Sequence, residues 1–211
     1  MIIAVDGPTA SGKGTIAKAL ARHFRLPHLD TGLLYRAVGY QVSLYNGDPD
    51  DPADALAATN FPDELLGHPD LRSEATGGLA SRVSVHPAVR QALFERQRSF
   101  ATQSAGAVLD GRDIGTVIAP DADVKLFVTA SVEARAHRRW MEMTRRGESH
   151  TLAQIEDDLR RRDERDTARK DAPLVAAPDA IMLDTSDMDK DAAIAAALAI
   201  VNDLTGQTPC P

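Results

Sequence analysis

The sequence contains almost no cysteine: the single thiol, Cys210, stands next to the last residue of the chain. One cysteine excludes a disulfide within the chain and any metal site built from several thiolates. No apolar run approaches the roughly 18 residues that a membrane-spanning helix needs, and the N-terminus lacks the basic start of a secretory signal. We therefore expect a protein of the reducing cytoplasm that has no membrane partner.

An excess of basic charge is also missing. The chain carries 24 Lys and Arg against 31 Asp and Glu, a formal net charge of −7. Proteins that bind DNA or RNA backbones irrespective of sequence need the opposite sign, so we expect no nucleic-acid partner. With 211 residues, of which 43% are hydrophobic, the chain can bury one substantial core. We expect a single domain over residues 1–211 and a monomer.

What the sequence does contain is a phosphate-binding loop of the form Gly-x-x-x-x-Gly-Lys. An apolar run, residues 2–5, precedes the loop, and a segment with apolar residues at helical spacing follows it. Glycines allow successive backbone N–H groups to converge on an anion, and the positive end of the following helix points to the same place. Lys13 adds a mobile charge that reaches the β- and γ-phosphates of ATP. The predicted ATP site comprises Gly7, Pro8, Thr9, Ala10, Ser11, Gly12, Lys13, Gly14 and Thr15.

The residues after the loop lysine narrow this prediction. A hydroxyl residue usually follows that lysine and coordinates Mg²⁺. Gly14 occupies the position here and Thr15 comes one place later, an arrangement similar to that of nucleoside-monophosphate kinases. We expect Mg²⁺ to be held through the nucleotide phosphates and water, with Thr15 as the candidate protein ligand. The guanine-reading segment Asn-Lys-x-Asp does not occur, which excludes a GTPase.

Strand and helix patterns alternate along the chain, which predicts an α/β fold with a parallel sheet. Residues 46–82 are rich in Gly, Pro and Asp and are predicted to form an insertion outside the sheet, with short helical pieces such as 53–58. The predicted strands are 2–6, 28–30, 107–110, 124–128 and 180–183. Helices are predicted from residue 13, from residue 31, and over 87–103, 131–146, 151–169 and 189–204.

Two short segments bring arginines to predicted strand ends, where the ligands of α/β proteins gather. In the first, Thr31 and Arg36 can flank one anion; alternatively, Thr31 caps a helix and Arg36 is a solvated charge. In the second, Arg112 offers a fork of donors beside the acceptor Asp113. The alternative is that these two residues form a surface ion pair, which would contribute little stability.

A third segment, 160–169, is dominated by arginine. Ordinary helix chemistry explains part of it, because three acid-before-base pairs at i,i+4 spacing would support a lone helix: Glu156–Arg160, Asp157–Arg161 and Asp158–Arg162. Arg162, Asp166 and Arg169 fall on one helical stripe that is suited to grip a phosphate and a sugar hydroxyl. Arg165 and Arg169 would repel each other at i,i+4, so we expect Arg169 to need an anion from outside the helix.

These motifs together resemble the bacterial cytidylate kinases, over nearly the whole chain. The segments that carry the resemblance are 6–15, 30–36, 81–90, 107–117 with 120–122, 133–139 and 162–174. The run Leu-Asp-Gly-Arg-Asp-Ile-Gly-Thr-Val is the most specific of them. The resemblance implies a P-loop NTP hydrolase fold with a five-stranded parallel sheet. It also implies a nucleoside-monophosphate (NMP)-binding insertion over 37–88 and a lid over 145–172. The chain departs from the family pattern in the insertion: only 44 residues separate Arg36 from Ser81, so we expect the insertion to be trimmed and mostly helical or irregular.

The activity that the resemblance implies is transfer of the γ-phosphoryl group of ATP to CMP or dCMP, with Mg²⁺. Carried over residue by residue, Arg36, Arg112 and Arg169 hold the CMP phosphate. Arg162 and Asp166 meet the phosphate and ribose. The residues expected to read cytosine are Ser81, Arg90 and Asp113, with Thr31 nearby. The expected catalytic residues are Lys13, Arg112, Arg139 and Arg162.

Some alternatives stay open at this point. Arg135 and Arg139 lie one turn apart on a predicted helix, where they either serve ATP and the lid or belong to an ordinary charged face. A kinase for shikimate, adenylate or uridylate would share the loop, but would not need Ser81, Arg90 and Asp113 together. A non-catalytic nucleotide-binding regulator would keep the loop without an arginine-rich acceptor pocket.

Overall fold

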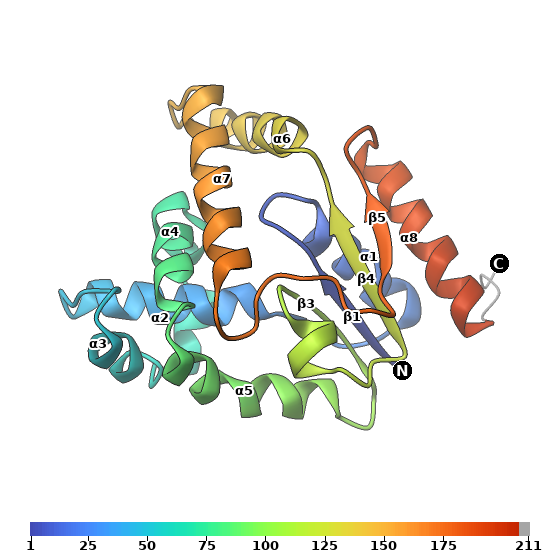
Figure 1. Ribbon diagram of the computed structural model, residues 1–211, viewed down its shortest axis with the longest axis horizontal. Coiled ribbons are helices and arrows are strands. Elements are labelled where there is room, and N and C mark those ends of the chain that lie inside the picture. Colours follow the sequence, from blue (N-terminus) through green and yellow to red (C-terminus); the bar gives the residue numbers. More distant parts are fainter. Residues whose placement is uncertain (207–211) are drawn as a thin grey trace.

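The computed structural model describes residues 1–206, so Cys210 lies outside the described residues. Its centre is a five-stranded sheet in which every strand pairs in parallel with its neighbours, in the order β2-β3-β1-β4-β5 (Figure 1). The strands are β1 (Ile2–Asp6), β2 (His28–Asp30), β3 (Ala107–Gly111), β4 (Val124–Thr129) and β5 (Ile181–Asp184). The predicted α/β fold with its parallel sheet is thereby confirmed.

Helices cover both faces of the sheet. α1 (Lys13–Phe24) and α8 (Lys190–Thr205) pack on one face, against inward side chains such as Ile3 and Val5. On the other face, Ala4 packs with α5 (Pro87–Ala101) and with η3 (Ile114–Ile118), a π-helical turn. Because both faces are buried, the strands read as nearly continuous apolar runs in the sequence.

The remaining helices lie beside the sheet in two groups. The first group comprises α2 (Thr31–Leu44), α3 (Pro52–Ala57), η1 (Asp63–Gly67), η2 (Pro69–Arg72) and α4 (Glu74–Val83); the second comprises α6 (Val132–Arg145) and α7 (Leu152–Ala168). The first group has its own apolar cluster. In the second group, α6 and α7 pack on each other through Ala136, Met143, Ile155 and Leu159. α7 lies next to α4, so the two groups meet over the edge of the sheet (Figure 1). Among the described residues, no helix is both long enough and apolar enough to cross a bilayer.

Helix α4 was not predicted, because two adjacent glycines in its middle disfavour a helix. Tertiary packing explains both the helix and one of the glycines. A Cβ on Gly77 would lie 2.8 Å from Nη2 of Arg36 and 3.1 Å from Nη2 of Arg162. A Cβ on Gly39 of α2 would lie 2.8 Å from Cβ of Leu79. Glycine at these positions lets α4 approach α2 and two arginines closely.

Candidate functional site

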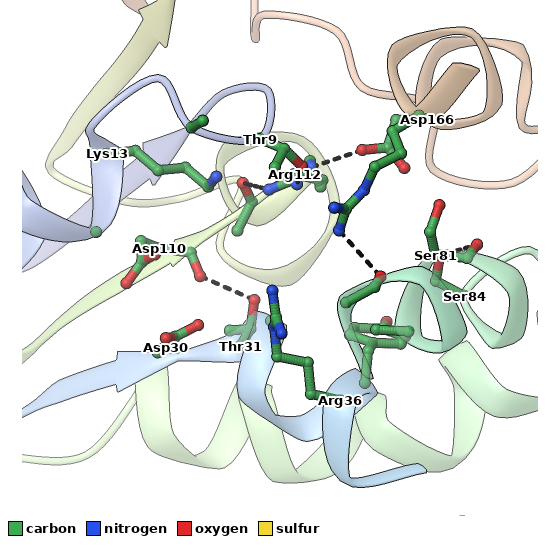
Figure 2. A pocket seen from close by; sticks show the side chains of 18 of the residues that line it. Thr9, Lys13, Asp30, Thr31, Arg36, Ser81, Ser84, Asp110, Arg112 and Asp166 are labelled. Atoms are coloured by element: carbon green, nitrogen blue, oxygen red, sulfur yellow. Dashed lines mark hydrogen bonds and ion pairs between the residues drawn. The ribbon is translucent and has the colours of Figure 1, made fainter. Parts of the chain in front are cut away.

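A cavity of about 480 Å³ opens at the carboxyl ends of β1, β2 and β3. Its walls are the phosphate loop, α2, α4, the turn after β3, α6 and the end of α7. Lys13 extends from the loop and Arg36 from α2 toward the same space, while Arg112 lies between the loop and Asp166 of α7 (Figure 2). A volume of this size is typical of small-ligand sites, and its position is the usual one in parallel α/β proteins.

Two glycines of the phosphate loop have positive φ angles, at which a residue with a side chain would be strained. Gly7 has φ +152°, and a Cβ there would lie 2.0 Å from the carbonyl oxygen of Val128. Gly12 has φ +91° and immediately precedes α1, which begins at Lys13 as predicted. Nζ of Lys13 donates to the carbonyl oxygen of Pro8 at 3.1 Å. The loop thus curls around the lysine and turns its backbone toward the cavity.

Most of the predicted loop residues line the cavity, and the others lie behind it. Ser11 is fully buried, and its Oγ has no partner among the described residues. Those behind the surface are Gly7, Pro8 and Ser11; those on it are Thr9, Ala10, Gly12, Lys13, Gly14 and Thr15.

Lys13 is a half-buried cation without a carboxylate in direct contact. Burial, with the nearby Arg112 as a smaller cause, lowers its pKa from 10.5 to about 7. A phosphate anion bound beside the ammonium group would favour the charged form and raise this pKa again.

We expect ATP binding at pH 8 to take up about one proton, because the free lysine is then mostly neutral and the bound one charged. The carboxylate of Asp6, whose pKa burial raises to about 6, is already ionised at that pH. Titration calorimetry in two buffers of different ionisation enthalpy measures the uptake. Lys13→Arg, which stays charged at pH 8, is the control that should abolish it. Equal binding heats in both buffers for the unsubstituted protein would contradict the expectation.

Arg112 links the phosphate loop to α7. Its Nε donates to Oδ2 of Asp166 at 2.7 Å, and its Nη2 donates to Oγ1 of Thr9 at 2.6 Å. Asp166 also accepts from Nη2 of Arg169 at 2.6 Å. Burial opposes ionisation of Asp166, but the two guanidinium groups hold its pKa below the ordinary value. The alternative of a surface pair between Arg112 and Asp113 is wrong.

Asp113 instead pairs with Arg90 of α5, and both side chains are at most one-tenth exposed. The guanidinium carbon of Arg90 lies 5.5 Å from the ring centroid of Tyr35. Oγ of Ser81 is buried and has no hydrogen-bond partner among the described residues. All four residues line the same end of the site. Together they form a partly dry pocket with a carboxylate, a guanidinium and an unused hydroxyl.

A buried carboxylate fixes the turn that carries Arg112 and Asp113. Asp6, at the end of β1, accepts the backbone N–H groups of Ile114 at 2.9 Å and Gly115 at 2.8 Å. These bonds hold the first turn of η3 against the sheet. A π-helical turn of this kind is frequent at functional sites, and it was not predicted from the sequence.

Thr31 is the first residue of α2, and Arg36 lies five residues further along the same helix. Oγ1 of Thr31 donates to the carbonyl oxygen of Asp110 at 2.9 Å. The helix is capped by Asp30, which accepts the backbone N–H of Leu33 at 3.2 Å, so the alternative that Thr31 is the cap is wrong. Burial, followed by the charges of nearby arginines, lowers the pKa of Arg36 to about 10. Nη1 of this arginine donates to two carbonyl oxygens, those of residues 71 and 73, both at 2.8 Å.

Arg162 turns inward from α7. Its Nη1 donates to Oε1 of Glu74 at 2.8 Å, and its Nη2 donates to the carbonyl oxygen of Gly77 at 2.9 Å. The predicted Asp158–Arg162 pair is therefore wrong: Asp158 accepts from Arg161 at 2.5 Å, because Arg162 lies on the side of the helix that packs on α4. The other two pairs are confirmed, with Glu156–Arg160 at 3.1 Å and Asp157–Arg161 at 2.7 Å.

The helix ends at Ala168, so Arg169 lies just outside it in an extended conformation. Its partner is Asp166, three residues earlier. The expectation that Arg169 needs an anion from outside this segment, and repels Arg165 along the helix, is corrected by this pairing. The guanidinium nevertheless lines the cavity.

The two arginines of α6 differ. Arg135 is buried and donates to the carbonyl oxygens of Thr9 at 3.2 Å and Ala130 at 3.0 Å, as well as to Asp163 of α7. It ties the phosphate loop to α7 and does not line the cavity. Arg139 does line the cavity and pairs with Glu74 and Glu142.

Every predicted substrate residue thus lines one cavity, although the sequence analysis missed several neighbours. Asp110 lies near the end of β3, inside the quoted run, and Tyr35 and Arg138 directly precede Arg36 and Arg139, so their positions gave a usable signal. Glu142 gave none, because only the packing of its helix brings it to the site. The missed lining residues include Asp30, Tyr35, Ser84, Asp110, Arg138 and Glu142.

Comparison with known proteins points to one family. A family model described as Cytidylate kinase matches residues 3–203. The chain is 55% identical over 201 residues to the cytidylate kinase of Caulobacter sp. strain K31, covering 95% of this chain and 93% of that protein. It is 54% identical over 199 residues to the cytidylate kinase of Cereibacter sphaeroides strain KD131, with 94% of each covered. The crystal structure of an uncharacterized protein from Eubacterium ventriosum has a TM-score of 0.56 at 16% identity, over 98% of this chain and 99% of that one, a likeness of fold alone.

Proposed function

Because the chain belongs to the cytidylate kinase family, we propose that the cavity at the end of β1, β2 and β3 is where it phosphorylates CMP or dCMP. The enzyme transfers the γ-phosphoryl group of ATP to the acceptor phosphate and yields ADP with CDP or dCDP. The observation that carries the assignment of the site is that a phosphate loop and an arginine-lined acceptor pocket share one cavity.

ATP occupies the loop side of the cavity in this proposal. The backbone N–H groups of the loop and the start of α1 bind the β-phosphate, and Lys13 reaches the γ-phosphate. Arg112 and Arg139 approach the same region from β3 and α6, and Arg162 approaches it from α7.

CMP occupies the side formed by α2, α4 and α5. Arg36, Arg112 and Arg169 bind its phosphate, and Arg162 with Asp166 contacts phosphate and ribose. Cytosine presents an amino donor next to ring acceptors. A carboxylate with a serine hydroxyl or an arginine forms a matching edge, and Asp113, Ser81 and Arg90 supply these groups. Thr31 lies close to this end of the site.

Mg²⁺ fits the oxygen-bearing side chains at the mouth of the loop. Within residues 1–206, no three side chains of His, Cys, Asp or Glu gather to hold a metal ion alone. Thr15, Asp30 and Asp110 line the cavity with hard oxygen donors, which suits an ion held by phosphates, water and one or two protein groups. When bound, Mg²⁺ supplies positive charge to the β- and γ-phosphates.

The residues act mainly by position and charge. A phosphate oxygen of CMP attacks the γ-phosphorus in line with the bond to the leaving β-phosphate, which carries away the electron pair. That oxygen is already ionised, so the reaction needs no general base. Lys13, Arg112, Arg139 and Arg162 stabilise the negative charge that spreads over the transferring group.

In this proposal two segments of the chain close over the cavity and so bring the two substrates together. Residues 37–88 are the NMP-binding segment, supported by their own apolar cluster, and residues 145–172 are the lid, supported by the packing of α7 on α6. Lid closure would exclude water from the transfer. We propose that the enzyme works in the cytoplasm, where ATP is available, and that it is a monomer.

Asp113→Asn tests the base assignment. Uracil would bring a carbonyl oxygen against the carboxylate of Asp113, whereas an asparagine amide can donate to that oxygen. We expect kcat/KM for CMP to fall and the preference for CMP over UMP to shrink about tenfold or more. A coupled ADP-release assay with CMP, dCMP, UMP and AMP measures both quantities.

Asp121→Asn is the matched control, because Asp121 forms an exposed pair with Arg98 at 2.7 Å. The control is expected to keep the full preference. An equal loss for CMP and UMP in Asp113→Asn would mean that Asp113 orients Arg90 and does not read the base.

A further inference from the structure

One carboxylate joins two arginines of the lid side to the acceptor side. Glu74 lies in the first turn of α4, and its Oε1 accepts from Nη1 of Arg162 at 2.8 Å. Its Oε2 accepts from Nη2 of Arg139. Arg139 belongs to α6 and Arg162 to α7, so Glu74 connects three helices that approach the cavity from different parts of the chain.

Glu74 is the counter-ion of three arginines. Arg36, Arg139 and Arg162 lie close together. Burial is the largest cause that lowers the pKa of Arg36, and the positive charges of Arg162 and Arg139 are the next. Burial opposes ionisation of Glu74, but the charges of Arg139, Arg162 and Arg36 hold its pKa below the ordinary value. The side chain of Glu74 is 25% exposed, against 12% for Arg139 and 9% for Arg162, so solvent screens these charges only in part.

Within the part of the chain that the structure describes, Arg139 has no other contact that could hold it against α4. Nη1 of Arg139 pairs at 3.1 Å with Glu142, which lies on the same helix, is 45% exposed and also binds Arg146. Nε of Arg139 is buried without a partner among the described residues. Arg162 has a second bond to α4 through the carbonyl oxygen of Gly77. Glu74 is therefore the contact that holds Arg139 against α4.

We propose that Glu74 is a positioning residue for phosphoryl transfer: it holds Arg139 and Arg162 at the cavity before the substrates bind. The inference rests on the roles proposed above for these two arginines. Without the carboxylate, three like charges would repel one another, and α6 and α7 would move away from α4. The two arginines would then have to be brought back to the cavity at each turnover. This requirement would slow phosphoryl transfer more than it would weaken CMP binding.

Glu74→Gln keeps the shape and removes the charge. We expect kcat to fall about tenfold, while KM for CMP changes less than about threefold. Glu133→Gln is the matched control: Glu133 is also an acid in the first turn of a helix, but it is 70% exposed and lies 3.7 Å from Arg160 outside the cavity. The control should retain the turnover of the unsubstituted enzyme. Glu74→Asp, which keeps the charge on a shorter side chain, should recover part of the loss.

A double-mutant cycle separates positioning from a general loss of stability. If Glu74 acts through Arg139, then Glu74→Gln should lower kcat far less in an Arg139→Ala background than in the unsubstituted enzyme. An equal loss in both backgrounds, or unchanged kcat in Glu74→Gln, would overturn the inference. Failure of Arg139→Ala and Arg162→Ala to affect turnover would instead contradict the proposed roles of the arginines.

Discussion

Replacement of Lys13 by alanine is expected to lower kcat by a factor on the order of 10²–10³ or more. Lys13 is the cation of the phosphate loop, and in the proposed mechanism its ammonium group neutralises the oxygens of the transferring phosphoryl group. Folding should not suffer, because burial already disfavours the charged lysine, as its pKa of about 7 indicates. A coupled ADP-release assay at saturating ATP and CMP measures the loss, and thermal unfolding checks the fold.

Lys190→Ala is the matched control for this substitution. Lys190 is the first residue of α8, just as Lys13 is the first residue of α1, but its side chain is exposed and does not line the cavity. The control should turn over like the unsubstituted enzyme. A folded Lys13→Ala variant with nearly normal kcat would refute the proposed role of the lysine.

Replacement of Arg162 by alanine is expected to lower kcat/KM for CMP by a factor on the order of 10². The side chain is only 9% exposed, lines the cavity and contacts both Glu74 and the carbonyl oxygen of Gly77, so alanine would remove a fixed cation from the site. Arg162→Lys keeps the charge but loses the fork of donors, and we expect an intermediate activity. Steady-state kinetics with CMP as the varied substrate measure the series.

Arg160→Ala provides the comparison on the same helix. Arg160 is 49% exposed and pairs with Glu156 at 3.1 Å, a local contact that contributes a few tenths of a kcal/mol. We expect this variant to be nearly as active as the unsubstituted enzyme. Equal, mild effects at positions 160 and 162 would mean that the segment is only a charged helix.

Much of the fold could be predicted because its signals are local. The strands of the sheet are short apolar runs, and α7 begins at a capping box formed by Thr151 and Gln154. The main miss was α4, where Gly77 and Gly78 lower the helix propensity. The reason for glycine at position 77 lies in α2 and α7, because the absence of a side chain there makes room for Arg36 and Arg162. No pattern within 46–82 contains that information.

The candidate site divides in the same way. Many of the residues that line the cavity follow from motifs, since loops at the carboxyl ends of parallel strands meet at one edge. The ion-pair partners of these residues, in contrast, could not be predicted from the sequence. Arg162 has Asp158 four residues earlier, yet it pairs with Glu74, and Asp113 pairs with Arg90 instead of the adjacent Arg112.

The sequence by itself determined the phosphate loop, the parallel sheet and many of the charged residues that line the cavity, because each depends on residues close together in the chain. Only the tertiary structure decided which acid holds which arginine. Arg162, for example, has Asp158 and Asp166 within reach along the sequence, and local ion pairs differ by only a few tenths of a kcal/mol. The packing of α4 against α7 excludes solvent on one side of the helix, and this burial selects Glu74 as the partner of Arg139 and Arg162.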